Sequence, residues 1–114
     1  MLEEDMQATL MEWFAWQYPA YDPLFWHTPN GGKRHIGVAV KLKRQGVKPG
    51  VPDNFLAVPR GAYHGFFLEL KSDKGKLSEK QSVKIDLLKA QGYAVAIEWT
   101  IEGAQKSINN YLKG

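Results

Sequence analysis

Apolar positions recur along this chain with two spacings, one typical of helices and the other typical of strands. The helical spacing predicts helices over 3–17, over 36–45, from about 79 to the glycine at 92, and from Thr100 onward. Short apolar runs predict strands over 24–28, 55–58, 66–70 and 93–99. This order of elements predicts an α/β fold, with one mixed β-sheet flanked by helices.

Residues at the predicted boundaries agree with this assignment. Pro19 and Pro23 break the chain after the first helix, and Gly46 follows the second as a C-terminal glycine. Ser78 and Gln81 have the Ser-x-x-Gln spacing of a capping box, which places a helix start near residue 79. Thr100 can cap the last helix.

The two central strands are joined by a short turn over 59–64, which predicts an antiparallel hairpin. Such a hairpin can bring Asp53, at the start of one strand, beside Glu69 and Lys71 near the end of the other. Residues two apart in a strand share a face, so Glu69 and Lys71 point the same way. The strand, helix and strand over 66–99 are long enough for a right-handed parallel crossover.

A carboxylate and an ammonium at the end of an apolar strand are costly to bury unless something pairs with them. Two carboxylates and one lysine together can hold a hard divalent cation and leave a positive charge for chemistry. The alternative is structural: Glu69 and Lys71 form an ion pair, and Asp53 caps a turn.

Positive charge is concentrated before Asp53. No Asp or Glu lies between Pro23 and Pro52, and this interval holds six cations: Lys33, Arg34, Lys41, Lys43, Arg44 and Lys48. They exceed the net charge of +3, so the rest of the chain is net acidic. A basic segment that leads into an acidic site suits a phosphodiester substrate, although a solvated basic surface is an equally simple explanation.

A glycine turn opens this basic segment. Exposed N–H groups beside cations can bind a phosphate. The candidate DNA contacts in this turn are therefore Asn30, Gly32, Lys33 and Arg34. The alternative is a tight strand-to-helix turn. Lys41, Lys43, Arg44 and Lys48 are candidate contacts farther along the DNA backbone.

Length and composition limit the class of protein, the kind of metal site and the location that we expect. The length of 114 residues predicts one domain over 1–114, and no apolar run approaches a membrane span. The chain has no cysteine, and its three histidines are scattered, so a metal would bind to oxygen ligands. The acidic first residues do not form a signal peptide, and we expect a cytoplasmic location. We expect the four tryptophans in the core or a subunit interface.

Five short motifs are the basis of a resemblance that extends from Glu3 to Leu112: Asn30–Arg34, Gly46–Asp53, Tyr63–Gly65, Glu69–Lys71 and Gln81. They resemble the virus-type replication-repair nuclease (VRR-NUC) domain, a family of PD-(D/E)xK nucleases, in its stand-alone phage and bacterial form. The resemblance implies a restriction-endonuclease-like core and an endodeoxyribonuclease dependent on Mg²⁺ or Mn²⁺, which hydrolyses phosphodiester bonds.

The resemblance also implies roles for particular residues. Asp53 and Glu69 hold the metal with the backbone carbonyl of Leu70, and Glu3 is a further candidate ligand. Lys71 orients the attacking water or stabilises developing charge. Glu3, four residues before Gln7, and Gln81 also join the site. Glu4 remains an alternative to Glu3, whose charge can equally complement the helix dipole, and Gln81 has the alternative role of closing the capping box.

Stand-alone members of this family imply a homodimer that acts on branched or Holliday-junction-type DNA in replication, repair or recombination. They also imply the cytoplasm of a bacterial or phage-infected cell. Two alternatives stay open from the sequence: a non-catalytic DNA-binding module with the nuclease fold, and a nuclease that acts on RNA.

Overall fold

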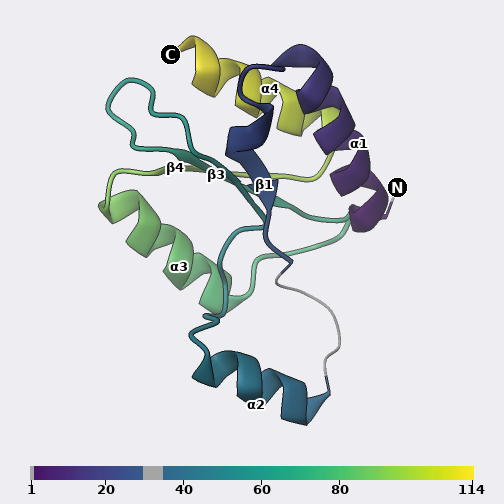
Figure 1. Cartoon of the computed structure of the whole chain (residues 1–114), viewed down its shortest axis with the longest axis vertical. Helices are drawn as coiled ribbons and strands as arrows, with labels where there is room; N and C mark the ends of the chain where they lie inside the picture. Colours follow the sequence, from purple (N-terminus) through teal and green to yellow (C-terminus); the bar gives the residue numbers. More distant parts are fainter. Residues whose placement is uncertain (1, 30–34) are drawn as a thin grey trace.

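The described strands form one four-stranded sheet in the order β1-β2-β3-β4 (Figure 1). The computed structural model describes residues 2–29 and 35–114. Its strands are β1 (Phe25–His27), β2 (Asn54–Leu56), β3 (Phe66–Leu70) and β4 (Ala94–Glu98). Its α-helices are α1 (Glu3–Gln17), α2 (Ile36–Arg44), α3 (Glu79–Ala90) and α4 (Ile101–Lys113), and a 3₁₀ turn spans Asp22–Leu24. The predicted α/β class and the order of elements are confirmed.

The sheet is mixed, as its connections predict. β2 pairs antiparallel with both β1 and β3, while β3 pairs parallel with β4 through the crossover helix α3. In the hairpin Asn54 lies opposite Leu68, so one step beyond the ladder Asp53 lies opposite Glu69. The predicted hairpin and its register are therefore confirmed.

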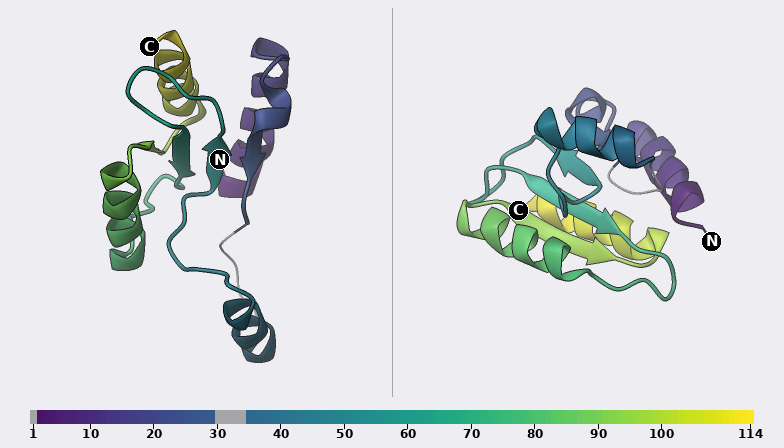
Figure 2. Two further views of the ribbon diagram at one scale, coloured as in Figure 1. Left: turned by 60° about the vertical axis from the view of Figure 1, so that its left-hand side comes forward. Right: turned by 90° about the horizontal axis from the view of Figure 1, so that it is seen from below.

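The helices cover the two faces of the sheet unequally. α1 and α4 lie on one face, and α3 lies on the other beside β4, as the two views in Figure 2 show. Alternate strand residues on the α1 and α4 side are buried: Phe25, Leu56, Phe66, Leu68 and Leu70. They pack against Met6, Leu10, Phe14, Ala104 and Ile108 in a single core cluster. The period of two in the strands and the helical stripes of α1 and α4 thus meet in one core.

The strand β2 is shorter than predicted. The apolar run at 55–58 predicts a strand to Val58, but the ladder ends at Leu56. Beyond it the Ala57 N–H donates to the Leu24 carbonyl, and the Val58 carbonyl accepts from the Tyr111 hydroxyl at 2.7 Å. Val58 is buried, so the apolar run reflects core packing by a residue outside the ladder.

Helix α2 stands apart from the sheet, at the bottom of Figure 1. None of its nine described residues is buried, and the side chains of Ile36, Val38 and Val40 are exposed by 80%, 49% and 56%. The helix bounds agree with the prediction, with Gly46 at a positive φ of 101° just beyond the end. Its apolar residues, however, do not reach the core.

Of the four tryptophans expected in the core or a subunit interface, three do not lie in the core. Trp13 packs against the core cluster, but Trp16, Trp26 and Trp99 are exposed by 88%, 44% and 42%. A tryptophan has enough apolar area to favour burial, yet its place on a helix or strand decides which layer it faces. Among the described helices, none is long and apolar enough to cross a membrane.

A pair of amides joins α1 to the sheet just beside Asp53. Asn54 is fully buried, and its amide exchanges two hydrogen bonds with that of Gln7, at 2.6 and 3.0 Å. Asn54 Nδ2 also donates to the Leu68 carbonyl at 3.4 Å. This pair fixes the start of β2 against both α1 and β3.

Replacing Asn54 by Ala should therefore destabilise the protein by roughly 1–3 kcal/mol, because the half-buried Gln7 amide loses its partner. The double variant with Gln7→Ala should cost less than the sum of the single changes, since both remove one interaction. Urea unfolding of the four proteins measures this coupling.

The matched control is Gln17→Ala, an exposed glutamine at the end of the same helix, which should change stability by less than about 0.5 kcal/mol. Strictly additive losses at positions 7 and 54 would contradict the coupling.

Candidate active site

Two carboxylates lie side by side where β2 begins and β3 ends. The Asp53 N–H donates to Glu69 Oε1 at 3.1 Å, and the Leu70 N–H donates to Asp53 Oδ2 at 3.3 Å. Each acidic side chain is thus held by the main chain of the opposite strand. This arrangement follows directly from the hairpin register.

The main chain of Asp53 is held on its other side by β1. Its carbonyl accepts from the Thr28 N–H at 2.6 Å and lies 3.0 Å from His27 Nδ1. A carbonyl only accepts, so we assign the ring proton of His27 to Nδ1. Sequence reasoning missed this role of His27, because it depends on which strand pairs with the far side of β2.

Lys71 lies in the same site. Its Nζ is 2.9 Å from Gln81 Oε1 and 3.8 Å from Glu69 Oε2, so Gln81 is its nearer partner. Gln81 Oε1 also accepts from the Ser78 N–H at 2.9 Å, while its Nε2 donates to Glu69 Oε2 at 3.3 Å. These contacts fix the orientation of the Gln81 amide, because the reverse orientation would place its NH₂ against two donors.

Gln81 therefore fills both roles that the sequence left open. The capping box of α3 is complete, with the Gln81 N–H bonded to Ser78 Oγ at 3.1 Å. The same side chain contacts Lys71 and Glu69. One glutamine thus ties the first turn of α3 to the carboxylate pair.

Gly50 brings the chain before Asp53 against that same helix start. Its φ is +79°, and a Cβ built there would lie 2.5 Å from the Lys80 carbonyl oxygen. Only glycine fits this close approach without displacing main chain. The loop that carries Asp53 and the turn that carries Gln81 therefore sit in direct contact.

These elements enclose a pocket of about 440 Å³. It is lined by Glu3, Pro49, Gly50, Val51, Asp53, Glu69, Lys71, Lys76, Ser78, Lys80 and Gln81. Glu3, rather than Glu4, belongs to this lining, and Glu3 Oε1 accepts from the Ser72 N–H at 2.8 Å. Gln7 instead bonds Asn54, behind the site. The sequence did not single out Lys76 and Lys80, which carry positive charge to the pocket.

Burial makes the acidic pair costly to ionise fully. Glu69 is 4% exposed, and burial followed by the nearby Asp53 carboxylate raises its pKa to about 8, with Lys71 opposing the shift. Burial also raises the pKa of Asp53. Two close carboxylates with raised pKa values hold a proton between them, or a metal in its place.

The donor set fits a hard divalent cation. The N–H and C=O of one strand residue point to the same side, so the Leu70 carbonyl is directed toward Asp53, where its N–H bonds. Two carboxylates and this carbonyl supply oxygen ligands only, with Glu3 at the pocket wall. No three His, Cys, Asp or Glu side chains are grouped to hold a metal within the described ranges, so water would complete the coordination.

The predicted DNA contacts fall into two groups. Asn30, Gly32, Lys33 and Arg34 lie outside the described residues. Lys41, Lys43 and Arg44 are exposed on α2, and Lys48 is exposed on the loop that follows. They surround hollows along α2 and the loop to Pro49, one of which also includes Lys80.

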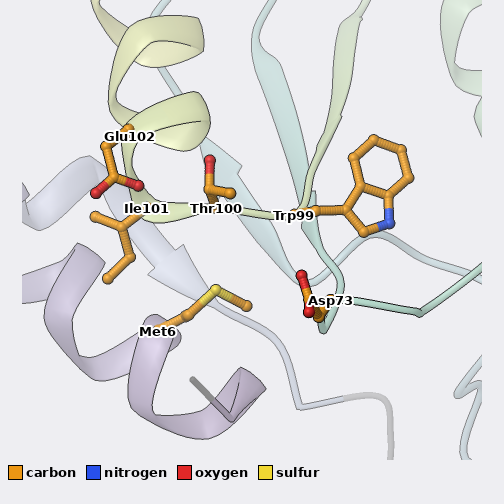
Figure 3. Close-up of a pocket in the computed structure, with 6 residues that line it drawn as sticks. All are labelled: Met6, Asp73, Trp99, Thr100, Ile101 and Glu102. Carbon is orange, nitrogen blue, oxygen red and sulfur yellow. The ribbon is translucent and has the colours of Figure 1, made fainter.

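A separate hollow, of about 240 Å³, opens at the start of α4 (Figure 3). Met6 lies at its base, with Ile101 and Glu102 on one side and Trp99 and Asp73 on the other. Its charged lining residues are both acidic, which makes it unsuited to a phosphate.

Comparisons with known proteins identify the family and the fold of the chain. Residues 1–98 match the model of the VRR-NUC domain family. A solved structure described as a VRR_NUC domain protein is similar to this chain with a TM-score of 0.86 and 30% sequence identity. The match covers 99% of this chain and 89% of the other. Among curated proteins, none matches the chain.

The raised pKa of Glu69 predicts how stability depends on pH without metal. Between its ordinary value of 4.5 and about 8, the folded chain binds a proton that the unfolded chain has lost. The free energy of unfolding should therefore be greatest below about pH 4.5, as far as this group is concerned, and decline as the pH rises to about 8. Urea unfolding with a chelator at several pH values measures the decline.

Glu69→Gln cannot titrate and should flatten this decline. The matched control is Glu12→Gln, which removes a carboxylate from the exposed side of α1. If the decline is as steep in Glu69→Gln as in the wild type, the buried carboxylate is not its source.

Proposed function

Because the chain belongs to the VRR-NUC family and is a nuclease domain of the PD-(D/E)xK type, we propose that it is a metal-dependent endonuclease that hydrolyses DNA phosphodiester bonds. The observation that carries the proposal is the pair of adjacent carboxylates, the buried Glu69 and the half-buried Asp53, with Lys71 3.8 Å from Glu69 in the same pocket. A structural ion pair needs one carboxylate, whereas this site brings two together.

Nucleases of this type typically use divalent metals, and the oxygen donors here favour Mg²⁺ or Mn²⁺. Asp53, Glu69 and the Leu70 carbonyl would hold the ion, and Glu3, on the pocket wall, would have to move toward the pair to join them. When bound, the ion supplies a Lewis acid for the scissile phosphate and lowers the pKa of a water.

Lys71 would act on the reacting groups rather than on the metal. Its ammonium donates to Gln81 Oε1 at 2.9 Å and lies farther, at 3.8 Å, from the Glu69 carboxylate. From there it can orient the attacking water or stabilise negative charge that develops on the phosphate oxygens. Gln81 is a positioning residue, because it holds both Lys71 and Glu69 in place.

DNA would lie along the positive residues around the pocket. Lys76 and Lys80 line the pocket itself, and the charge extends along α2 and the loop after it through Lys41, Lys43, Arg44 and Lys48. Contacts of this kind bind phosphates and do not distinguish one base sequence from another.

We further propose a homodimer that acts on branched DNA. The described chain carries one carboxylate pair, and two symmetry-related sites would suit paired cuts in a junction. The exposed apolar residues of α2 offer area for contact between copies. Light scattering that gives a monomer mass at micromolar concentration would contradict the homodimer.

The direct test of the proposed activity is a panel of duplex, flap and four-way junction DNAs, each with Mg²⁺ or Mn²⁺. We expect cleavage that a chelator abolishes, and faster cleavage of the branched substrates. If neither metal supports cleavage of any substrate, the chain is a binding module with the nuclease fold.

Metal binding and catalysis should separate by mutation. Asp53→Asn and Glu69→Gln should lose both calorimetric metal binding and cleavage, because a neutral amide is a weaker ligand for a hard cation. Lys71→Met should keep or raise metal affinity, since it removes a nearby positive charge, but lower cleavage by roughly 10²–10³-fold. Near-wild-type cleavage by Lys71→Met would show that this lysine is only an ion-pair partner.

The two roles of Gln81 should separate in the same way. Ser78→Ala and Gln81→Ala both remove part of the α3 cap and should each cost about 1 kcal/mol of stability. Cleavage should fall by about 10–100-fold only in Gln81→Ala, because Ser78 contacts neither Lys71 nor Glu69 through its side chain. Equal cleavage by the two variants would leave Gln81 with the capping role alone.

The positive residues of α2 should position DNA without selecting its sequence. The triple change of Lys41, Lys43 and Arg44 to Ala should weaken binding equally across sequences and reduce the salt slope by about 1 for each phosphate that the variant no longer binds. The control removes the same charge from exposed lysines elsewhere: Lys89, Lys106 and Lys113. A loss confined to one DNA sequence, or an equal loss in the control, would contradict this role.

A further inference from the structure

The carboxylate pair shares its face of the sheet with a row of aromatic rings. Residues two apart in a strand point the same way, so Phe55 lies on the face of Asp53, and Phe67 lies on the face of Glu69. Trp26 on β1 is directly opposite Phe55, which is directly opposite Phe67. The ring centroids are 5.3 Å apart for Trp26 and Phe55, and 4.4 Å apart for Phe55 and Phe67.

This row is covered at one end and open at the other. α3 packs beside β4, and Tyr93 lies against Phe67 with ring centroids 5.5 Å apart. β1 is at the opposite edge of the sheet (Figure 2), and there Trp26 is 44% exposed. Phe55 and Phe67 are half-buried, so the solvent-facing member of the row is Trp26.

The supporting rings hold Trp26 in place. Phe55 packs down onto Gly65, where an added Cβ would lie 2.8 Å from the ring. The neighbour of Trp26 in the chain, His27, contacts the carbonyl of Asp53 at 3.0 Å. Two residues of strand span about 7 Å, so Phe55 and Phe67 lie about that far along their strands from Asp53 and Glu69, and Trp26 lies beside Phe55 on the next strand. The indole and the candidate metal ligands are thus parts of one face of the sheet.

The other exposed tryptophans lack this placement. Trp16 is on α1, which covers the opposite face of the sheet. Trp99 donates its indole N–H to the Gly75 carbonyl at 2.8 Å and lines the acidic hollow with Asp73 and Glu102 (Figure 3). The carboxylates of that hollow repel a phosphate backbone. The pocket on the face of the sheet that carries Trp26 is instead lined by Lys71, Lys76 and Lys80.

We propose that Trp26 stacks on an unpaired nucleobase of the DNA strand whose phosphate is held at Asp53 and Glu69. The inference rests on the proposed nuclease function and names its substrate more narrowly, as DNA with unpaired nucleotides next to the cut. A base inside a duplex already has both faces stacked, whereas an unpaired base can use an exposed indole. A second copy of the chain is a poorer occupant, because one half-exposed ring is small against the roughly 800 Å² per partner of a stable interface.

Binding assays can test the stacking apart from catalysis. Fluorescence anisotropy with Ca²⁺, to prevent turnover, would compare oligothymidine and a flap substrate with a fully paired duplex. Trp26→Ala and Trp26→Leu should bind the unpaired substrates about 5- to 100-fold more weakly, while duplex binding is unchanged. Trp26→Phe should retain most of the affinity, and Trp16→Ala should bind as the wild type does.

Trp26→Leu keeps an apolar side chain over Phe55, so its thermal unfolding should match that of the wild type and exclude misfolding. Wild-type affinity of Trp26→Leu for the flap, or an equal loss on duplex, overturns the stacking. A fall in the mass of Trp26→Ala by light scattering, with unchanged DNA affinity, would assign the ring to contact between copies and also overturns it.

The outcomes for the two proposals differ. If the wild type cleaves DNA while the Trp26 variants bind unpaired substrates normally, only the stacking fails. If the wild type cleaves no substrate but binds the flap through Trp26, only the nuclease proposal fails.

Discussion

The register of the β2–β3 hairpin is the constraint on which the candidate site depends. It places Asp53 opposite Glu69, so that each strand donates a main-chain N–H to the carboxylate of the other. A slip of one residue would turn every side chain of one strand to the other face and separate the pair. The amides of Gln7 and Asn54 resist such a slip, because they fix the start of β2 to α1 and to β3.

The same site opposes folding electrostatically. Two partly or fully buried carboxylates with raised pKa values are retained at the end of an apolar sheet, with a lysine that lies closer to Gln81 than to Glu69. Lys71 still lies 3.8 Å from Glu69 and opposes the rise in its pKa, so it offsets part of this cost.

Local signals in the sequence predicted most of the fold. The caps at Ser78 and Thr100, the hairpin turn and the parallel crossover each depend on residues close together in the chain, and the structure has all of them. The hairpin predicted that Asp53, Glu69 and Lys71 lie together, whereas Gln81 was placed with them by the family resemblance, since its spacing from Ser78 predicted only a capping box.

Features set by distant packing could not be predicted. The contact of His27 with the Asp53 carbonyl requires the pairing of β1 with β2, and nothing in the local sequence fixes that pairing. The apolar residues of α2 have the same helical period whether or not a core lies beneath them. The exposure of Trp26 likewise depends on α3 reaching β4 and not β1.

The place of Gln81 also has a consequence for dynamics. Its side chain belongs both to the first turn of α3 and to the site, so fraying of that turn must break its contact with Lys71. Helix ends open far more readily than a whole domain unfolds. The contacts of Gln81 with Lys71 and Glu69 are therefore only as durable as one turn of helix, whereas the strands hold the two carboxylates through their own main chain.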